Sequence, residues 1–402
     1  MLSMLGSFAS VMQTIGYIVL AVCVLLLMVL LHELGHYIVG RILKFKITEF
    51  SIGFGKVLFQ RTNKRGEKIS LRLFPLGGFC AFAGEDDVDD DAENKDSQNI
   101  EEIKNKDEIN LEDIKPLESV KKDTDLKFNE QKPWKRILVY LAGVTFNFLS
   151  AFIFSFILLV STGYGNAYVV TNVNGTNIDF LKPNEIILSI NDIDIDYVYG
   201  NTLETIITKD TPEPIKLKVK AENGEIREIE LYKVTYMVDK KDENGETVKD
   251  SDGNIVKESV TNYGLELAYT NVRYSFGGAL ARCVPYTFQL GGIIVKSLWL
   301  VLTFQVPLKD LGGPITTVSM IAHSASYGLA SFLWLLPLLA ANLAVFNLIP
   351  FPALDGSHVI FTTIEWIRKK PINRKVEAYI HFIGLCILFA FVVVVDIIHL
   401  VA

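Results

Sequence analysis

The stretch IGYIVLAVCVLLLMVLLHELGHYIVG, residues 15–40, joins a long apolar run to the first charged side chain of the protein, Glu33. From Ile15 to Leu31 nothing is more polar than Tyr17 and Cys23. About 20 mostly apolar residues are enough for a helix to cross the hydrocarbon of a bilayer. The stretch therefore predicts a membrane-spanning helix that carries the sequence HELGH.

The HExxH pattern in this stretch predicts a metal site. On a helix, His32 and His36 lie one turn apart on one face and can bind one zinc ion, with Glu33 beside them as a general base. Ionisable side chains at membrane depth are costly and usually functional. The simpler alternative is a helix end whose histidines face lipid headgroups. A catalytic zinc also needs a third protein ligand and an open position for water.

Composition indicates a membrane protein with substantial soluble parts, because half of the 402 residues are hydrophobic. The net charge of −7 is uneven: residues 85–130 hold 18 acidic and 7 basic side chains and lack aromatic residues until Phe128. Such a segment cannot bury a core, so we expect a disordered loop. No basic cluster with interleaved aromatic residues suggests a nucleic-acid partner. The four cysteines have no CxxC spacing and predict neither disulfides nor a thiolate metal site.

Uncharged stretches predict four transmembrane helices, at about Met12–Gly40, Ile137–Gly163, Gly328–Leu354 and Ile380–Val395. Residues 279–304 contain Arg282 and Lys296, and predict an amphipathic helix at the membrane interface instead. Lys and Arg gather in 41–136 and 361–379, which predicts that these parts are cytoplasmic. Both termini and residues 164–310 would then be extracytoplasmic, and the HExxH sequence would lie toward the cytoplasmic side.

A candidate third ligand, Asp355, ends a stretch of 44 residues without charge, in the sequence NLIPFPALDG at 347–356. The predicted orientation brings it to the same membrane depth as His32 and His36. Pro350 and Pro352 interrupt regular helix, so the carboxylate can turn toward a neighbouring helix. An aspartate at a helix end that meets cytoplasmic water is the alternative.

The sequence resembles the site-2 proteases over nearly its whole length, and specifically the PDZ-containing bacterial branch called regulator of sigma-E protease. The resemblance rests on the following motifs in this order: HELGH at 32–36, FSIGFG at 50–55, PLGG at 75–78, Trp134 with Arg136, Ala142-Gly143 with Asn147, Gly313-Pro314, and NLIPFPALDG at 347–356. The family commonly has Asp-Gly-Gly-His where this chain has Ser357, and often a proline where it has Val144.

The resemblance implies zinc held by His32, His36 and Asp355, with Glu33 as the base. It implies intramembrane proteolysis of single-span membrane proteins, such as anti-sigma factors or signal-peptide remnants, by a multi-pass protein of the bacterial inner membrane. The asparagines at membrane depth, Asn147, Asn342 and Asn347, would bind substrate or form interhelical hydrogen bonds. His358 is either a fourth ligand or a helix-end histidine near water.

We therefore expect a polytopic α-helical membrane protein with a re-entrant β-hairpin sheet and an inserted extracytoplasmic PDZ-like α+β domain. A PDZ-like sequence, Leu181–Asn191, has Asn184-Glu185 in place of Gly-Asp. The expected segments are 1–40, first transmembrane helix; 41–84, re-entrant sheet; 85–133, acidic disordered cytoplasmic loop; 134–163, second transmembrane helix; 164–235, PDZ-like domain; 236–272, added β-hairpin; 273–327, interfacial helix and linker; 328–360, third transmembrane helix; and 361–402, basic loop and fourth transmembrane helix.

Two other functions fit parts of the pattern. An inactive relative could bind and escort membrane helices, although the complete set of His32, Glu33, His36 and Asp355 argues against it. A transporter would have paired helical repeats and charged pathways at the bilayer midplane, and the sequence has no such repeat.

Overall fold

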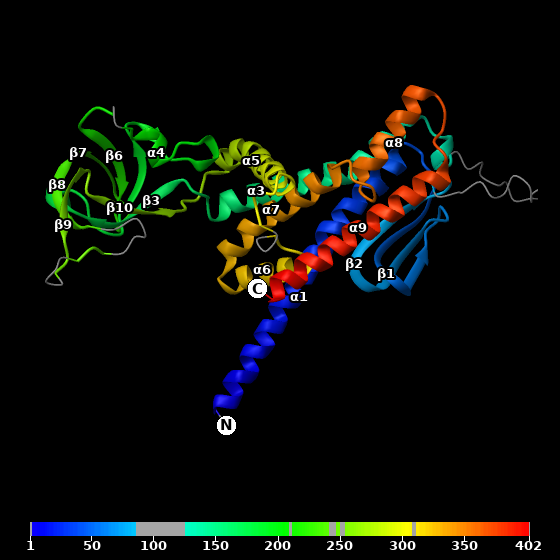
Figure 1. The fold of residues 1–402 in the computed structure, drawn as a ribbon, viewed down its shortest axis with the longest axis horizontal. Coiled ribbons are helices and arrows are strands. Elements are labelled where there is room, and N and C mark those ends of the chain that lie inside the picture. The colour runs from blue at the N-terminus through cyan, green and yellow to red at the C-terminus, as the bar shows by residue number, and fades with distance from the viewer. Residues whose placement is uncertain are drawn as a thin grey trace, which may run out of the picture. The chain divides into compact units, whose positions relative to one another are not determined.

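The computed structural model describes residues 2–85, 125–208, 211–240, 247–249, 254–307 and 311–401. It divides into two compact units, one formed by Met1–Phe152 with Leu290–Ala402 and the other by Ile153–Gln289 (Figure 1). Each unit is described by itself. Most of the predicted acidic loop, 86–124, lies outside the described residues.

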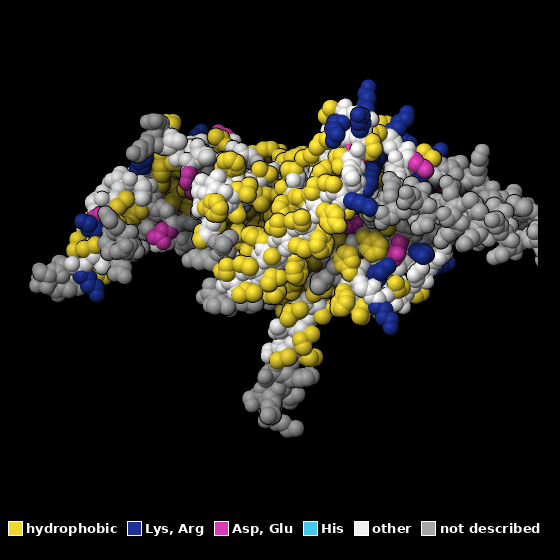
Figure 2. Space-filling view, turned by 45° about the vertical axis from the view of Figure 1, so that its right-hand side comes forward, with side chains coloured by type: hydrophobic (Ala, Val, Ile, Leu, Met, Phe, Trp, Pro, Cys, Tyr) yellow, Lys and Arg dark blue, Asp and Glu magenta, His cyan; other side chains and the backbone are white. Residues whose placement is uncertain are grey.

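Five described helices are long and apolar enough to cross a membrane, which makes the chain a multi-pass membrane protein. They are α1 (Leu2–Ile42), α3 (Pro133–Ser161), α5 (Phe276–Leu302), α7 (Leu329–Leu348) and α9 (Arg374–Val401). Figure 2 shows hydrophobic side chains over much of the visible helical surface. A polytopic helical protein is thus confirmed.

Helix α5 is the fifth candidate span, where the sequence predicted four spans and an interfacial helix. Its mean hydropathy of 1.2 is the lowest of the five, against 2.0 to 2.9 for the others. Arg282, which interrupts the apolar pattern, lies 2.5 Å from the buried carboxylate of Asp196 and stacks over Tyr274. This pairing neutralises the charge inside its own unit. The interfacial position of α5 stays a prediction.

Strands β1 (Ile47–Thr62) and β2 (Lys68–Phe82) form an antiparallel sheet of four short segments. Residues 47–52 pair on one side with 78–82 and on the other with 68–71, and 57–62 pair with 68–72. The strands bend at Gly53, Gly55 and Gly77, whose φ angles are 85°, 84° and 110°. Such left-handed conformations favour glycine. The sequence predicted a sheet in 41–84, and β1 and β2 form one there, joined by a turn at 63–66.

The segment predicted as the third span, 328–360, is not one continuous helix. Helix α7 ends at Leu348, and α8 (Asp355–Arg368) begins after the loop that contains Pro350 and Pro352. In this loop Ala353 has a φ of 82°, and its N–H donates to Nδ1 of His381 at 3.0 Å. The prolines interrupt the helix as predicted, and Asp355 starts the next one.

A buried ion pair fixes α8 against the start of α3. Arg136 and Glu365 are 2.8 Å apart, and both side chains are only 6% exposed. Charged groups in such an environment persist only when they are paired. The pair therefore holds the helix that carries Asp355.

Helix α6 (Pro314–Ser326) begins at the carboxylate of Asp396, which is buried on α9. Asp396 accepts from the N–H of Ile315 and the hydroxyl of Thr316, both at 3.4 Å. A side chain at Gly313 would collide with this carboxylate. A negative charge at a helix N-terminus is favourable, so Asp396 ties α6 to α9.

The unit formed by residues 153–289 has its own hydrophobic core under a six-stranded sheet. The order is β10-β3-β4-β6-β7, with β5 paired to β4, and β8 and β9 form a separate hairpin. The bounds are β3 Ala167–Val173, β4 Ile186–Ile190, β5 Ile193–Asp194, β6 Ile215–Lys220, β7 Ile226–Leu231, β8 Val234–Asp239, β9 Lys257–Asn262 and β10 Leu265–Thr270, with short helices η1 Phe128–Glu130 in the other unit and η2 Gly175–Asp179, η3 Tyr197–Tyr199 and α4 Leu203–Ile206 in this one.

Strands β8 and β9 pair antiparallel and overlap the segment 236–272, in which the sequence predicts an added hairpin. Asn184 has a φ of 70°, so it takes the left-handed conformation for which a glycine stands in the PDZ pattern. Glu185 is buried and lies 2.7 Å from Arg227. These features explain the substitutions in the PDZ-like sequence, but the assignment to the PDZ fold stays a prediction.

Candidate metal centre

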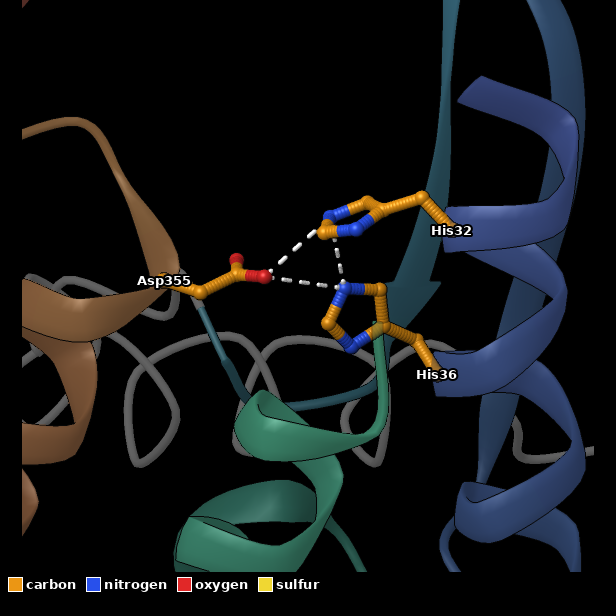
Figure 3. A group of neighbouring side chains, drawn as sticks. All are labelled: His32, His36 and Asp355. Carbon is orange, nitrogen blue, oxygen red and sulfur yellow. Dashed lines mark hydrogen bonds and ion pairs between the residues drawn. The ribbon is translucent and has the colours of Figure 1, made fainter. Parts of the chain in front are cut away.

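Three side chains from two helices converge on one point (Figure 3). Nε2 of His32 and Nε2 of His36 lie 3.1 and 3.3 Å from the same oxygen, Oδ2 of Asp355, and 3.2 Å from each other. Both histidines are buried, with 7% of each residue exposed. The sequence predicted this set, and the structure brings it together.

Local structure explains the convergence. His32 and His36 are four residues apart in α1, so they project from one face, and their rings meet edge to face at 84°. Asp355 is the first residue of α8, directly after the proline-containing loop. A side chain at Gly356 would collide with the backbone carbonyls of Leu348 and Ile349. The tight return from α7 to α8 thus requires glycine next to Asp355.

The three atoms fit a zinc ion. Ligand bonds of about 2.0–2.1 Å in tetrahedral geometry place ligand atoms about 3.3–3.4 Å apart. The three separations are 3.1, 3.2 and 3.3 Å. Oδ2 of Asp355 is buried, and none of the described residues donates a well-aligned hydrogen bond to it. Two imidazoles and one carboxylate are also a donor set that zinc accepts, so these residues can hold the ion and leave a fourth position open.

Helix α3 supplies the outer contacts of both imidazoles. Nδ1 of His36 lies 2.8 Å from the carbonyl oxygen of Val139, and Nδ1 of His32 lies 3.0 Å from the amide nitrogen of Asn147. A Cβ atom at Gly143 would collide with Nε2 of His36 and with the ring of His32. The close packing of α3 on α1 is therefore part of how the site is built.

Glu33 lies between the two histidines in sequence and faces the sheet. Its carboxylate accepts a hydrogen bond from the backbone of Cys80. A Cβ atom at Gly78 would come within 3.4 Å of Cγ of Glu33. The partly buried carboxylate thus lies beside the segment of β2 that forms one edge of the sheet.

The remaining predicted residues differ in their distance from this group. Asn147 contacts His32, whereas Asn342 is exposed and Asn347 donates to Leu343 in its own helix at 3.0 Å. His358 does not join the three ligands. Its ring stacks between Tyr140 and His381, in a second group of metal-binding residue types formed with Glu377.

Sequence reasoning missed Val139 and the role of Gly143. The backbone carbonyl of an apolar residue carries no signal of its own. The spacing of 139, 143 and 147, four residues apart, is a signal that could have been used, because it places all three on one face of a helix.

Comparison with known proteins assigns the family. The sequence pattern of peptidase family M50 matches residues 20–391. Similar proteins described as "Putative zinc metalloprotease" include one from Campylobacter jejuni, 27% identical over 91% of this chain and 88% of the relative. Another, from Clostridium perfringens, is 28% identical over 95% of this chain and 97% of the relative. A third, from Fusobacterium nucleatum, is 26% identical over 94% and 96%.

The match covers most of the chain, including both helices that supply the convergent group, and the relatives align over nearly their full lengths. The chemistry of that group, two imidazoles and a carboxylate at zinc-binding separations, agrees with the description of the relatives. The chain is thus a zinc metalloprotease of the site-2 protease type and belongs to peptidase family M50.

Proposed function

We propose that the protein is an intramembrane endopeptidase that hydrolyses peptide bonds within the transmembrane segments of single-span membrane proteins. The observation that carries the proposal is the position of His32, Glu33 and His36 within a candidate span, Ser10–Ile42. Ionisable side chains within a membrane span are energetically costly and usually mark a functional site. Anti-sigma factors and signal-peptide remnants are the substrates that the family resemblance suggests.

In this proposal His32, His36 and Asp355 are the zinc ligands and Glu33 is the general base. A zinc ion held by these residues would polarise a carbonyl oxygen and would make water a stronger nucleophile near neutral pH. Glu33 accepts the proton of the attacking water and then passes it to the nitrogen of the leaving amine. The hydrogen bond from the backbone of Cys80 holds the Glu33 carboxylate beside the sheet.

The sheet beside Glu33 suggests how a substrate is held. An unwound substrate segment has bare N–H and C=O groups, which the bilayer cannot satisfy. Residues 78–82 pair with β1 on one side, and this segment of β2 lies against Glu33. Addition of the substrate as a further strand would satisfy its backbone and bring a peptide bond near the base.

Exposed apolar side chains on the sheet support its insertion into the membrane. They include Phe54, Leu58, Phe59, Leu73 and Phe74. The same sheet carries Lys and Arg near its turn at 63–66, as expected for a hairpin whose base stays at the headgroups. We infer that the sheet is re-entrant, from the side where α1 ends.

Charge distribution supports an orientation in the bacterial inner membrane with the candidate site toward the cytoplasm. Lys and Arg are concentrated after the end of α1 and around the connection of α8 to α9, and Figure 1 draws both termini away from these regions. The positive-inside rule then assigns an extracytoplasmic location to the termini and to residues 164–235. We infer that this PDZ-like segment limits the size of the substrates that are cut.

Asn342 and Asn347 are the proposed substrate-binding amides. Asn342 is exposed on α7, and Asn347 is the penultimate residue of α7, directly before the loop that leads to Asp355. Amides can pair with both groups of an extended backbone. Substitution of either by leucine should raise KM for a membrane substrate and leave bound zinc unchanged.

The experiment that tests the function is cleavage of a tagged single-span substrate in membranes by wild type and by Glu33→Gln at equal expression. Glu222→Gln, at an exposed position of the other unit, is the matched control for the same chemical change. The proposal expects cleavage by wild type and Glu222→Gln and none by Glu33→Gln. Equal cleavage by all three would assign the activity to another protease.

The escort function makes a different prediction for the same variants. An inactive relative that only binds membrane helices would capture the substrate equally with or without the Glu33 carboxylate and would cleave none. Crosslinking of the substrate to wild type without any product, at saturating zinc, would favour it over the protease.

A further inference from the structure

One face of α3 forms a row of groups against the two histidines. Val139, Gly143 and Asn147 follow one another at intervals of four residues, so they lie above one another on the helix. Each contacts the imidazoles differently: a carbonyl oxygen toward His36, an absent side chain beside both rings, and an amide toward His32. These are three independent contacts from one helix.

Nδ1 contacts decide whether an imidazole can bind a metal. A neutral imidazole has one N–H and one lone pair, so Nε2 can bind zinc only when the proton is on Nδ1. The carbonyl oxygen of Val139, 2.8 Å from Nδ1 of His36, can only accept and therefore selects this tautomer. The backbone of α3 thus favours the tautomer of His36 in which Nε2 has a lone pair for zinc.

The partner of His32 can be oriented in two ways, because an amide group presents either an oxygen or a nitrogen. With the nitrogen of Asn147 facing Nδ1, as in the structure, His32 must accept there and carry its proton on Nε2. That tautomer cannot bind zinc through Nε2. The oxygen Oδ1 of the same side chain is meanwhile buried without a hydrogen-bond partner in the described chain.

Rotation of the Asn147 amide by 180° would change both the tautomer of His32 and the burial of Oδ1 without a hydrogen-bond partner. Oδ1 then takes the place 3.0 Å from Nδ1, receives the proton of His32, and leaves the lone pair of Nε2 for zinc. Amide orientation follows from the hydrogen-bond network, and a ligand role for His32 requires this one. Asn147 is also fully buried, which suits a contact to a ligand better than a contact to an entering substrate.

We propose that Asn147 is a positioning residue that accepts the Nδ1 proton of His32 and thereby holds Nε2 toward zinc. Val139 does the same for His36 through its carbonyl. Gly143 has no side chain and so leaves the space that both imidazole rings occupy. The inference rests on the ligand assignment of the proposed function and replaces a substrate-binding role for Asn147. Of the three asparagines, it leaves Asn342 and Asn347 as the proposed substrate-binding amides.

The test uses zinc affinity of the purified full-length protein, which requires neither substrate nor cleavage. The variants are Asn147→Leu, which has no acceptor, and Asn147→Asp, which keeps an oxygen in the same place. Asn342→Leu is the control for the same change on another helix. Competition with a chelator gives the zinc Kd, and the absorption spectrum of the Co(II)-loaded protein reports the ligand geometry.

We expect Asn147→Leu to bind zinc about 10- to 100-fold more weakly, the usual result of losing an outer partner of a ligand. Asn147→Asp should keep wild-type zinc affinity within a few-fold and the same Co(II) spectrum, because a carboxylate also accepts the Nδ1 proton. Asn342→Leu should keep both. The aspartate variant carries the test if the leucine variant does not fold.

Two results would overturn the inference. Wild-type zinc affinity and an unchanged Co(II) spectrum in Asn147→Leu would mean that His32 needs no acceptor from α3. Zinc loss in a folded Asn147→Asp variant would mean that the amide nitrogen, as donor, is the group that matters. Failure of the protease proposal would look different: zinc binding would follow this pattern, and no single-span substrate would be cut.

Discussion

Among the described residues, two groups of metal-binding residue types lie in the same unit, yet only one of these two has the geometry of a metal site. In the first, His32, His36 and Asp355 direct three atoms to one point, with the imidazole rings at 84°. In the second, His358 and His381 stack with ring centroids 4.0 Å apart and an angle of 14° between their planes. Imidazole lone pairs lie in the ring plane, so those of nearly parallel stacked rings cannot meet.

The hydrogen bonds of the second group also oppose metal binding. Nδ1 of His381 accepts from the N–H of Ala353, so a neutral His381 carries its proton on Nε2. Nδ1 of His358 is 3.9 Å from the Glu377 carboxylate, beyond hydrogen-bond distance. Proximity of histidine and carboxylate is thus not enough to make a metal site. Side chains that converge on one point, with an acceptor on the outer nitrogen of His36, distinguish the first group.

Removal of one histidine from each group should give the largest difference in zinc content between two variants. His36→Ala deletes one of three proposed ligands and should abolish both stoichiometric zinc binding and cleavage. His358→Ala should keep one zinc per chain. Elemental analysis of the purified variants after dialysis against dilute chelator measures this directly, and equal zinc loss in both variants would remove the distinction between the groups.

A side chain at Gly143 should damage the first group without removing any ligand. Gly143→Ala places a Cβ atom against both imidazoles, so the rings must move. Small displacements of catalytic groups can cost about 100-fold in rate. We therefore expect cleavage to fall by about that factor and zinc affinity to fall with it.

The control for this glycine change is Gly292→Ala. Gly292 is also helical, and a Cβ atom there would have no described neighbour within 4 Å. It should be indistinguishable from wild type in the same cleavage and zinc assays. Normal cleavage by Gly143→Ala would mean that α3 is packed less closely on the histidines than the structure has it.

Loss of the ion pair between Arg136 and Glu365 should destabilise the helix that both groups share. Helix α8 carries Asp355 and His358, and removal of one partner of a buried pair costs about 3–5 kcal/mol. Arg136→Met should lower the melting temperature in detergent. The double variant Arg136→Met with Glu365→Met should recover much of that loss, because no unpaired charge remains. Additive losses would contradict a direct coupling.

The smallest effect should come from His381→Phe. It removes the acceptor for the Ala353 N–H, a hydrogen bond worth about 1 kcal/mol, and keeps an aromatic ring for stacking. We expect a small decrease in melting temperature with full zinc content. A loss of zinc would show that the loop before Asp355 depends on this hydrogen bond for its position.

Sequence alone identified the residues of the first group but not the contacts that orient them. HExxH on an apolar helix implies two imidazoles on one face, and the prolines before Asp355 predict the break that frees it. The contacts of Val139 and Gly143 depend on which face of α3 packs on α1, which local patterns do not determine. For the same reason His358 stayed open between a fourth ligand and a plain helix-end histidine.

The sheets were predictable in position but not in pairing. The sequence predicted a sheet in 41–84, yet the pairing of residues 47–52 on both sides follows from bends at glycines with positive φ. In the other unit the sequence predicted an α+β domain, but it did not predict the strand order β10-β3-β4-β6-β7. Pairing between distant strands depends on tertiary contacts that local patterns leave open.

Zinc K-edge X-ray absorption of the purified wild type and of His358→Ala asks which of the two groups holds the metal. We expect one zinc per chain with nitrogen and oxygen ligands at about 2.0–2.2 Å and the same spectrum in both proteins. A second zinc in wild type, or a ligand shell that loses an imidazole in His358→Ala, would contradict it.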